Sequence, residues 1–178
     1  MTAFSYQLYS SRNFPPLADT LAMLAKAGYA QVEGYGALYA DESSLSVLDK
    51  GLKDNGLTMP TGHFSLEMCR DSPARVLEIA RVLGVKAIIV PYIMPDERPK
   101  DAAGWAAFGK ELARVGKPFQ DAGLAFGYHN HDFEFVPTEN GELPIDLILA
   151  ADDGIKLELD VAWSVKGKAD AAATLRKY

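Results

Sequence analysis

The residues that could carry chemistry gather in one short stretch of the sequence, residues 128–135. Two of the chain's three histidines, His129 and His131, stand there, and Glu134 follows closely. Alternate side chains of an extended strand share a face, so Gly127, His129 and His131 are expected on one side. Imidazole and carboxylate groups held together can move protons or bind a divalent cation. This stretch is therefore the first candidate for an active site.

A second group of polar residues lies in residues 157–163, where leucines alternate with acidic residues. If the leucines face a layer of helices, Glu158 and Asp160 face the opposite way, toward the interior. Two inward carboxylates are unfavourable unless they are paired, hydrogen-bonded or bound to a metal. We predict Asp160 as a metal ligand and Glu158 as a buried hydrogen-bond partner. His63 and Glu33 end two earlier strand-like segments and can join them.

Each of these groups also has a simpler interpretation. His63 alone fits a hydrogen-bonded core histidine, and residues 129–134 fit a solvated loop. Their combination with Asp160 favours a site over either alternative.

A repeating pattern supplies the elements that would bring these residues together. Helix-like segments end at a glycine, where a left-handed backbone conformation is common, and a strand-like run follows at once. These glycines are Gly28, Gly56, Gly84, Gly123 and Gly154. The predicted strands are Ala3–Tyr9, Ala30–Gly34, Thr58–Phe64, Lys86–Tyr92, Leu124–His129 and Ile155–Val161. Apolar residues at three- and four-residue steps over 105–119 predict a helix packed on the sheet.

Strict alternation of strands and helices implies a parallel sheet covered by helices, either a closed barrel or an open doubly wound sheet. Residues 10–16, after the first strand, contain no glycine and so no glycine-rich phosphate loop. Polar residues end nearly every strand, as in a barrel. We predict one α/β domain over residues 1–178, a (β/α)8 TIM barrel with about six of its eight units in this chain. The sequence thus looks incomplete, or another chain closes its missing edge.

Composition excludes several classes of function. The 178 residues include 18 basic and 24 acidic side chains, a net charge of −6, which argues against nucleic-acid or membrane-surface partners. Cys69 is the single cysteine, so we expect no intramolecular disulfide, a reducing compartment and a buried, unreactive thiol. The N-terminus lacks a secretion-signal pattern and apolar runs are too short to span a bilayer, which predicts a cytoplasmic protein.

The sequence resembles the sugar phosphate isomerase/epimerase family, the xylose-isomerase-like TIM barrels. The resemblance covers the whole chain, and its fifth- and sixth-strand motifs together are fairly specific to the family. The segments that carry it are Gln7–Arg12, Val32–Gly34, Gly62–Phe64, Tyr128–Phe135, Leu157–Trp163 and Lys166–Lys168.

The resemblance implies proton transfer next to a carbonyl through an enediolate, with one divalent metal ion (Mn, Mg, Co or Zn). Glu134 and Asp160 would be the first two metal ligands, and a histidine and a glutamate from strands seven and eight would complete the set. His63, His129 and His131 would orient substrate hydroxyls or shuttle protons, and Glu134 would also be catalytic. The substrate-binding residues implied are Gln7, Tyr9, Glu33, Trp163, Lys166 and Lys168.

Several alternatives stay open at this point. The family also contains keto-sugar dehydratases and lyases, which share the enolate step. A DNA-repair endonuclease of a related barrel type would need a basic groove and more histidines than three. A non-catalytic sugar-binding remnant fits if the protein ends at Tyr178. The expected partner is a small carbohydrate, and association into a homo-oligomer is compatible with every one of these interpretations.

Overall fold

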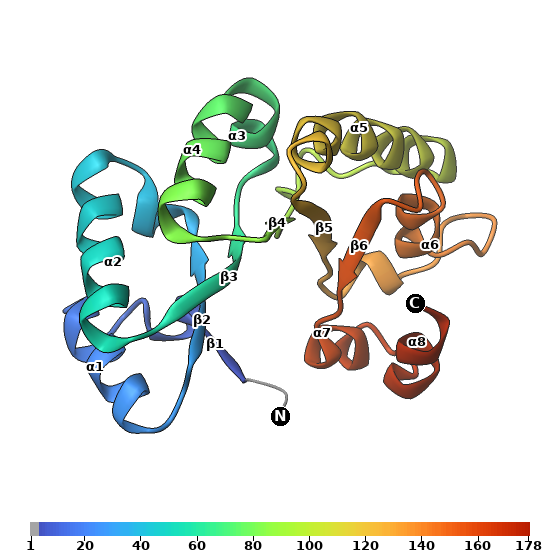
Figure 1. Cartoon of the computed structure of the whole chain (residues 1–178). Helices are drawn as coiled ribbons and strands as arrows, with labels where there is room; N and C mark the ends of the chain where they lie inside the picture. Colours follow the sequence, from blue (N-terminus) through green and yellow to red (C-terminus); the bar gives the residue numbers. More distant parts are fainter. Residues whose placement is uncertain (1–3) are drawn as a thin grey trace.

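The computed structural model describes residues 4–178, which form one curved, six-stranded parallel sheet with helices on its outer side (Figure 1). Each strand pairs with the next along the chain, in the order β1-β2-β3-β4-β5-β6. The strands are β1 Ser5–Gln7, β2 Gln31–Tyr35, β3 Thr58–His63, β4 Ala87–Val90, β5 Ala125–His129 and β6 Ile155–Glu158. Six successive βα units of a TIM barrel are therefore present, as the sequence predicts.

Eight α-helices and three short 3-10 helices connect and cover the strands of residues 4–178. The α-helices are α1 Leu17–Lys26, α2 Glu42–Asn55, α3 Leu66–Asp71, α4 Pro73–Leu83, α5 Ala102–Asp121, α6 Pro144–Leu149, α7 Val161–Lys166 and α8 Ala171–Lys177. The 3-10 helices are η1 Leu8–Ser11, η2 Gly36–Tyr39 and η3 Phe133–Phe135. None of the helices in this part of the chain is long and apolar enough to cross a membrane.

The predicted helix ends are largely confirmed. Gly28, Gly56, Gly84 and Gly123 all have a positive φ, the conformation that favours glycine after a helix. Gly154 is the exception, because α6 already ends at Leu149 and the Gly154 N–H instead donates to the Asp152 side chain in a turn.

Strand boundaries differ most at the two edge strands. The expected first strand begins at Ala3, which lies outside the described residues, and β1 ends at Gln7, where η1 begins. The sixth strand was expected to reach Val161 but ends at Glu158. The Asp160 carboxylate accepts the Trp163 N–H and so starts α7. The cap places Asp160 just beyond the strand rather than within it.

The core lies between the sheet and its helices, and β5 shows how it is built. Phe126 and Tyr128 are fully buried against α5, with Phe119 stacked on Phe126 at 5.6 Å between ring centroids. A Cβ added to Gly127 would lie on the opposite face of the sheet, 2.5 Å from the Lys156 carbonyl oxygen. The predicted alternation of β5 and the predicted α5 stripe are thus confirmed, and His129 is left on the inner side of the sheet.

Candidate active site

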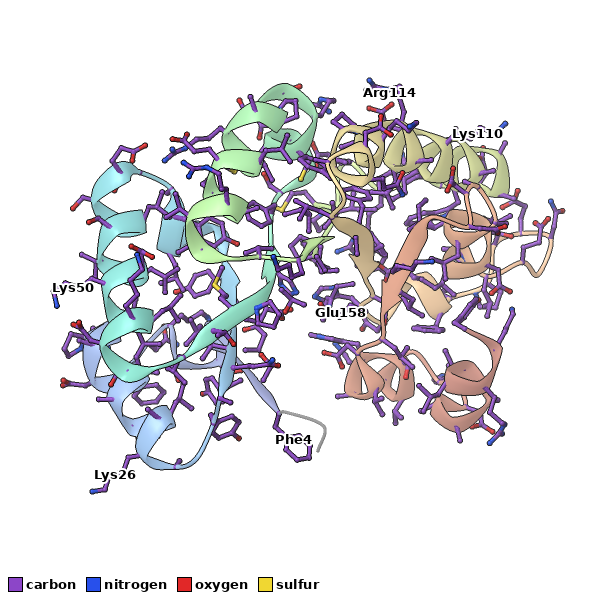
Figure 2. All side chains as sticks on the ribbon, viewed as in Figure 1. Phe4, Lys26, Lys50, Lys110, Arg114 and Glu158 are labelled. Carbon is purple, nitrogen blue, oxygen red and sulfur yellow. The ribbon has the colours of Figure 1, made fainter. Side chains whose placement is uncertain are left out.

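The carboxyl ends of four strands bring two glutamates and two histidines into contact. Glu158, at the end of β6, is the centre of the group: its Oε1 lies 2.9 Å from His63 Nε2 and 2.9 Å from His129 Nδ1. His129 is the direct register partner of Glu158 across β5 and β6, while His63 comes from the end of β3. Figure 2 shows Glu158 on the inner side of the curved sheet. The sheet curvature, rather than proximity in sequence, therefore assembles the group.

Glu33 completes this group from β2. Its Oε1 lies 3.2 Å from His63 Nε2, and its other oxygen accepts the Thr61 hydroxyl. Gln7 at the end of β1 lies 3.4 Å from the second His63 nitrogen, measured from its amide nitrogen. Both nitrogens of His63 therefore face protein partners. We call Glu33, His63, His129 and Glu158 the inner cluster.

Burial and mutual charge separate the proton affinities of the inner cluster. Desolvation, assisted by the negative charge of Glu158, raises the pKa of Glu33 from 4.5 to about 7. Burial opposes protonation of His63, but its hydrogen bond to Glu158 and the charge of Glu33 raise its pKa overall. Burial would raise the pKa of Glu158, yet hydrogen bonds from His129 and His63 lower it. One glutamate therefore stays ionised while the other exchanges its proton near neutral pH.

Glu134 lies in a different environment from the one expected of a free metal ligand. It is fully buried, with Oε1 accepting the Tyr128 hydroxyl at 2.5 Å and Oε2 accepting the His131 backbone N–H at 2.8 Å. Burial raises its pKa, although these hydrogen bonds act in the opposite direction. In this arrangement its carboxyl group holds the turn that follows β5.

Asp160 is fixed by its neighbours at the start of α7. Its Oδ1 accepts the Trp163 N–H at 2.9 Å, and its Oδ2 lies 3.9 Å from His129 Nε2. Asn130 accepts the Asp160 N–H and donates to the Asp160 carbonyl, which ties the ends of β5 and β6 together. The second carboxylate oxygen of Asp160 thus borders the inner cluster.

A second group, which we call the aromatic cluster, lies beside the inner cluster. The His131 ring lies 4.7 Å from Tyr92, 4.9 Å from Trp163 and 6.0 Å from Phe133, measured between centroids. The guanidinium of Arg98 lies 3.6 Å from the Phe133 ring centroid. Burial, and then the neighbouring His129, lower the pKa of His131 to about 4, so its ring is neutral at physiological pH.

The remaining predicted substrate-binding residues are more exposed. Tyr9 is 50% exposed in η1, just after β1, and packs edge-on against Tyr35. Lys166 pairs with Asp132 at 2.9 Å and lies over the Trp163 ring at 4.3 Å. Lys168 has a positive φ of 65° in the turn after α7. Sequence reasoning missed Thr61 and Arg98, and Arg98 could have been found as a basic residue in the loop after the fourth predicted strand.

Three atoms of the inner cluster fit a divalent metal ion. One donor atom each of His63, His129 and Glu158 lies within 4.8 Å of the other two, the one such three-residue group within residues 4–178. Two imidazoles and a carboxylate form a donor set that suits Zn²⁺, Co²⁺ or Mn²⁺ better than Mg²⁺, which prefers oxygen. Glu134 does not belong to this group.

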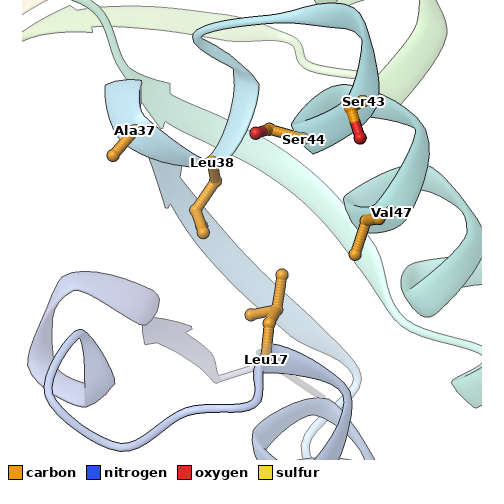
Figure 3. A pocket seen from close by; sticks show the side chains of 6 residues that line it. All are labelled: Leu17, Ala37, Leu38, Ser43, Ser44 and Val47. Atoms are coloured by element: carbon orange, nitrogen blue, oxygen red, sulfur yellow. The ribbon is translucent and has the colours of Figure 1, made fainter.

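A surface depression of about 200 Å³ lies elsewhere, between the starts of α1 and α2 (Figure 3). It is lined by Leu17, Ala37, Leu38, Ser43, Ser44 and Val47. Its walls carry no titratable group and no residue of either cluster, so it does not compete with them as a reaction site.

Solved structures show the same arrangement of strands and helices. A sugar phosphate isomerase/epimerase from Parabacteroides distasonis superimposes with a TM-score of 0.84 at 24% identity, over 99% of this chain and 71% of that one. The fold is that of the xylose isomerase-like TIM barrels. The resemblance seen in the sequence is thus confirmed in the three-dimensional neighbours. No protein-family model and no curated protein matches the sequence.

Other structural neighbours differ in their described activities. A probable 3-DHS dehydratase from Bacillus anthracis has a TM-score of 0.70 at 14% identity, over 99% of this chain and 69% of that one. A family 2 AP endonuclease from Brucella melitensis has a TM-score of 0.68 at 16% identity, over 90% of this chain and 69% of that one. The fold accordingly supports enzymes of several reaction types.

Proposed function

We propose that this chain carries the proton-transfer centre of a metal-dependent isomerase or epimerase that acts on a sugar or sugar phosphate. The observation that supports this is the inner cluster: Glu33, His63, His129 and Glu158 meet from four strands at the carboxyl ends of a TIM-barrel sheet. Active sites of this architecture are built at that end. Paired carboxyl and imidazole groups with separated proton affinities are what acid–base catalysis requires.

Glu33 is the proposed proton acceptor. It has a pKa of about 7 through burial, so near neutral pH it can both accept and return a proton. The resemblance implies that Glu134 is catalytic as well as a metal ligand, and burial raises its pKa too. His129, whose Nδ1 donates to Glu158, would accept a hydrogen bond from a substrate hydroxyl at Nε2 and so orient the sugar. His63, whose two nitrogens face Gln7 and the two glutamates, would hold Glu33 and Glu158 in place.

Two donor sets compete for the metal ion. The resemblance implies Glu134 and Asp160, whereas His63, His129 and Glu158 form the three-donor group that is already assembled. When bound at either set, a divalent ion supplies Lewis-acid polarisation of the carbonyl next to the transferred proton. A metal ion at His63, His129 and Glu158 would take up the side chains of the inner cluster themselves, whereas an ion at Glu134 and Asp160 would leave the inner cluster free to hold the substrate.

Solvent proton exchange tests the proposed reaction directly. The chain is incubated in D₂O with MnCl₂ and D-ribulose, D-xylulose, D-fructose or their phosphates, and ¹H NMR follows loss of the C–H signal next to the carbonyl. For a sugar that exchanges, Glu33→Gln and Glu134→Gln should each slow exchange by roughly 10²- to 10⁴-fold. Glu139→Gln, which removes an exposed carboxylate outside both clusters, is the matched control.

The possible results separate the alternatives. Exchange that none of these variants slows would contradict the site, and absence of exchange with every sugar would contradict the reaction. Exchange followed by loss of water, seen as a new conjugated carbonyl absorbance, would indicate a dehydratase, the activity described for the Bacillus anthracis neighbour. Cleavage of an abasic-site oligonucleotide would favour the endonuclease alternative, which the net charge of −6 argues against.

A further inference from the structure

Arg98 is a basic side chain at the mouth of the sheet with no acidic partner. It lies in the loop between β4 and α5, half-buried, and within residues 4–178 its guanidinium forms no ion pair with a carboxylate. Arg70, Arg75 and Arg114, on the outer helices, each pair with an acidic neighbour. Partial burial of an unpaired charge is unfavourable, so an arginine kept in this state points to a missing anion.

The contacts of Arg98 within the described residues include no ion pair, although its charge helps to oppose the rise in the pKa of buried Glu134. Its Nε donates to the Ile93 carbonyl at 3.1 Å and its Nη2 donates to the Tyr92 hydroxyl at 2.6 Å. The Phe133 ring lies below the guanidinium plane, with its centroid 3.6 Å from Cζ. These contacts leave Nη1 without a protein partner in the described part of the chain. A fixed, planar guanidinium with free N–H groups is suited to binding phosphate or carboxylate oxygens.

Arg98 also lies close to the proposed reaction site. Tyr92, which it contacts, packs edge-on against His131 at 4.7 Å, and His131 lies 5.1 Å from His129 of the inner cluster. Tyr92 follows β4 and Phe133 follows β5, so Arg98 sits at the same end of the sheet as Glu158. One small molecule bound across the aromatic cluster would therefore place its two ends at Arg98 and at the inner cluster.

The other basic candidates at this end are less suitable. Of the two lysines that the resemblance implies for substrate binding, Lys166 is already paired with Asp132 at 2.9 Å, and Lys168 is exposed in the turn after α7. Arg12 lies over the Tyr9 ring and donates to the Tyr9 carbonyl, so its contacts stay within its own segment beside the edge strand. The carboxylates of the inner cluster repel an anion, which makes a dedicated cation necessary for binding one.

We propose that Arg98, held by Tyr92 and Phe133, binds the anionic group of a charged sugar and so selects phosphorylated or carboxylated substrates over neutral ones. This inference rests on the proposed function for the sugar part of the ligand. The anion-binding part stands on the contacts of Arg98 alone. Arg98 is thus a specificity-determining residue at the distal end of the substrate, away from the proton transfer.

Fluorescence titration tests the inference without requiring turnover. Trp163 and Trp105 contact the aromatic cluster, at 4.9 Å from His131 and 6.3 Å from Phe133, so they report ligands bound there. The probes are inorganic phosphate, the pair D-ribulose and D-ribulose 5-phosphate, and the pair D-glucose and D-glucuronate. The two sugar pairs separate a preference for phosphate from one for carboxylate. We expect the charged member of at least one pair to bind roughly tenfold or more tightly than the neutral one.

Variants then assign that preference to Arg98. Arg98→Gln should bring the Kd of the charged sugar to that of the neutral one, and Arg98→Lys should keep only part of the preference because it lacks the planar fork. Arg81→Gln removes the same charge from α4, near the start of β4 and so at the opposite end of that strand from Arg98, and should leave all Kd values unchanged. Circular dichroism and thermal unfolding confirm that each variant is folded.

Each outcome decides between the claims. Equal affinity for charged and neutral sugars in the native chain, or a preference that survives Arg98→Gln or is lost in Arg12→Gln, overturns the role of Arg98. Phosphate binding that depends on Arg98, without proton exchange on any sugar, keeps the anion site and overturns the proposed function. If instead neutral sugars exchange at a rate that Arg98→Gln does not change, and charged sugars bind no more tightly than neutral ones, the proposed function stands and the anion-binding role of Arg98 is overturned.

Discussion

Glu33→Gln provides a sharp test of the electrostatics of the inner cluster, because it removes a titrating group and keeps nearly the same shape. Glu33 is 7% exposed, accepts the Thr61 hydroxyl and faces His63 Nε2 at 3.2 Å. Its pKa rises from 4.5 to about 7 in the folded chain, mainly through burial. At about 1.4 kcal/mol per pKa unit, this difference corresponds to on the order of 3 kcal/mol of folding free energy.

The sign follows from which state binds the proton more tightly. A carboxyl group whose folded-state pKa is raised stabilises the fold fully below its unfolded pKa, and this contribution is lost as the pH rises through the folded pKa. The loss from Glu33 therefore falls between pH 4.5 and about 7. The raised pKa of His63 adds a loss in the same direction above its ordinary value of 6.5. Glutamine cannot ionise, so the variant should lose much less stability over this range.

Urea unfolding followed by tryptophan fluorescence, at pH 5, 6, 7 and 8 with EDTA present, measures the effect. The unfolding free energy of Glu33→Gln minus that of the native chain should rise by on the order of 3 kcal/mol from pH 5 to pH 8. Glu139→Gln, an exposed control, should give a difference that does not change with pH. If the difference in unfolding free energy between Glu33→Gln and the native chain also does not change with pH, Glu33 is not a neutral buried acid and its proposed pKa is wrong.

Four further predictions address the metal, the sheet, the β5 turn and the thiol. If His63, His129 and Glu158 hold the metal ion, calorimetric titration with MnCl₂ or ZnCl₂ should show at least tenfold weaker binding in His129→Gln and Glu158→Gln. Weaker binding only in Glu134→Gln and Asp160→Asn would instead assign the ion to Glu134 and Asp160. Gly127→Ala should destabilise the chain by about 1–3 kcal/mol in urea unfolding, because its Cβ would lie 2.5 Å from the Lys156 carbonyl oxygen. Gly36→Ala is the control and should be tolerated, because a Cβ there has no neighbouring atom within 4 Å. Tyr128→Phe leaves buried Glu134 without one donor and should cost about 1–3 kcal/mol, while an unchanged urea midpoint would contradict that hydrogen bond. Cys69, buried and with its pKa raised to about 12, should react with Ellman's reagent only on unfolding, and rapid labelling of the folded chain would contradict its placement.

The sequence was enough to predict the fold because each level of pattern agreed. Helix-ending glycines such as Gly56 and Gly84, period-two strands and the apolar stripe of α5 all indicated the same repeated unit, and the structure contains six of them. Boundaries were less predictable where a side chain competes with the strand. Asp160 caps α7 and thereby ends β6 early, which alternation of apolar and acidic residues cannot reveal.

The candidate site was predictable in its members but not in their partners. The sequence predicted His63 and His129 at strand ends and Glu158 deeper in its strand as a hydrogen-bond partner, and the structure shows Glu158 at the end of β6, bonded to both histidines. The sequence could not show that curvature brings β2 and β3 close enough for Glu33 to contact His63. It also could not show that the Tyr128 hydroxyl occupies one oxygen of Glu134. Pairings between distant strands depend on register and sheet curvature, which local patterns do not determine.

Whether a charged side chain such as Arg98 forms an ion pair is also not determined by local sequence. In the sequence Arg98 is one of 18 basic residues in an acidic chain, and only its place in the loop after the fourth predicted strand sets it apart. Only the folded structure shows that Phe133, from the turn after β5, lies against its guanidinium while no carboxylate among residues 4–178 pairs with it. Lys166, which the resemblance offered for that role together with Lys168, forms an ion pair with Asp132. The free charge, rather than the presence of a basic residue, determines which side chain can bind an anionic ligand, and free charge is a property of the fold.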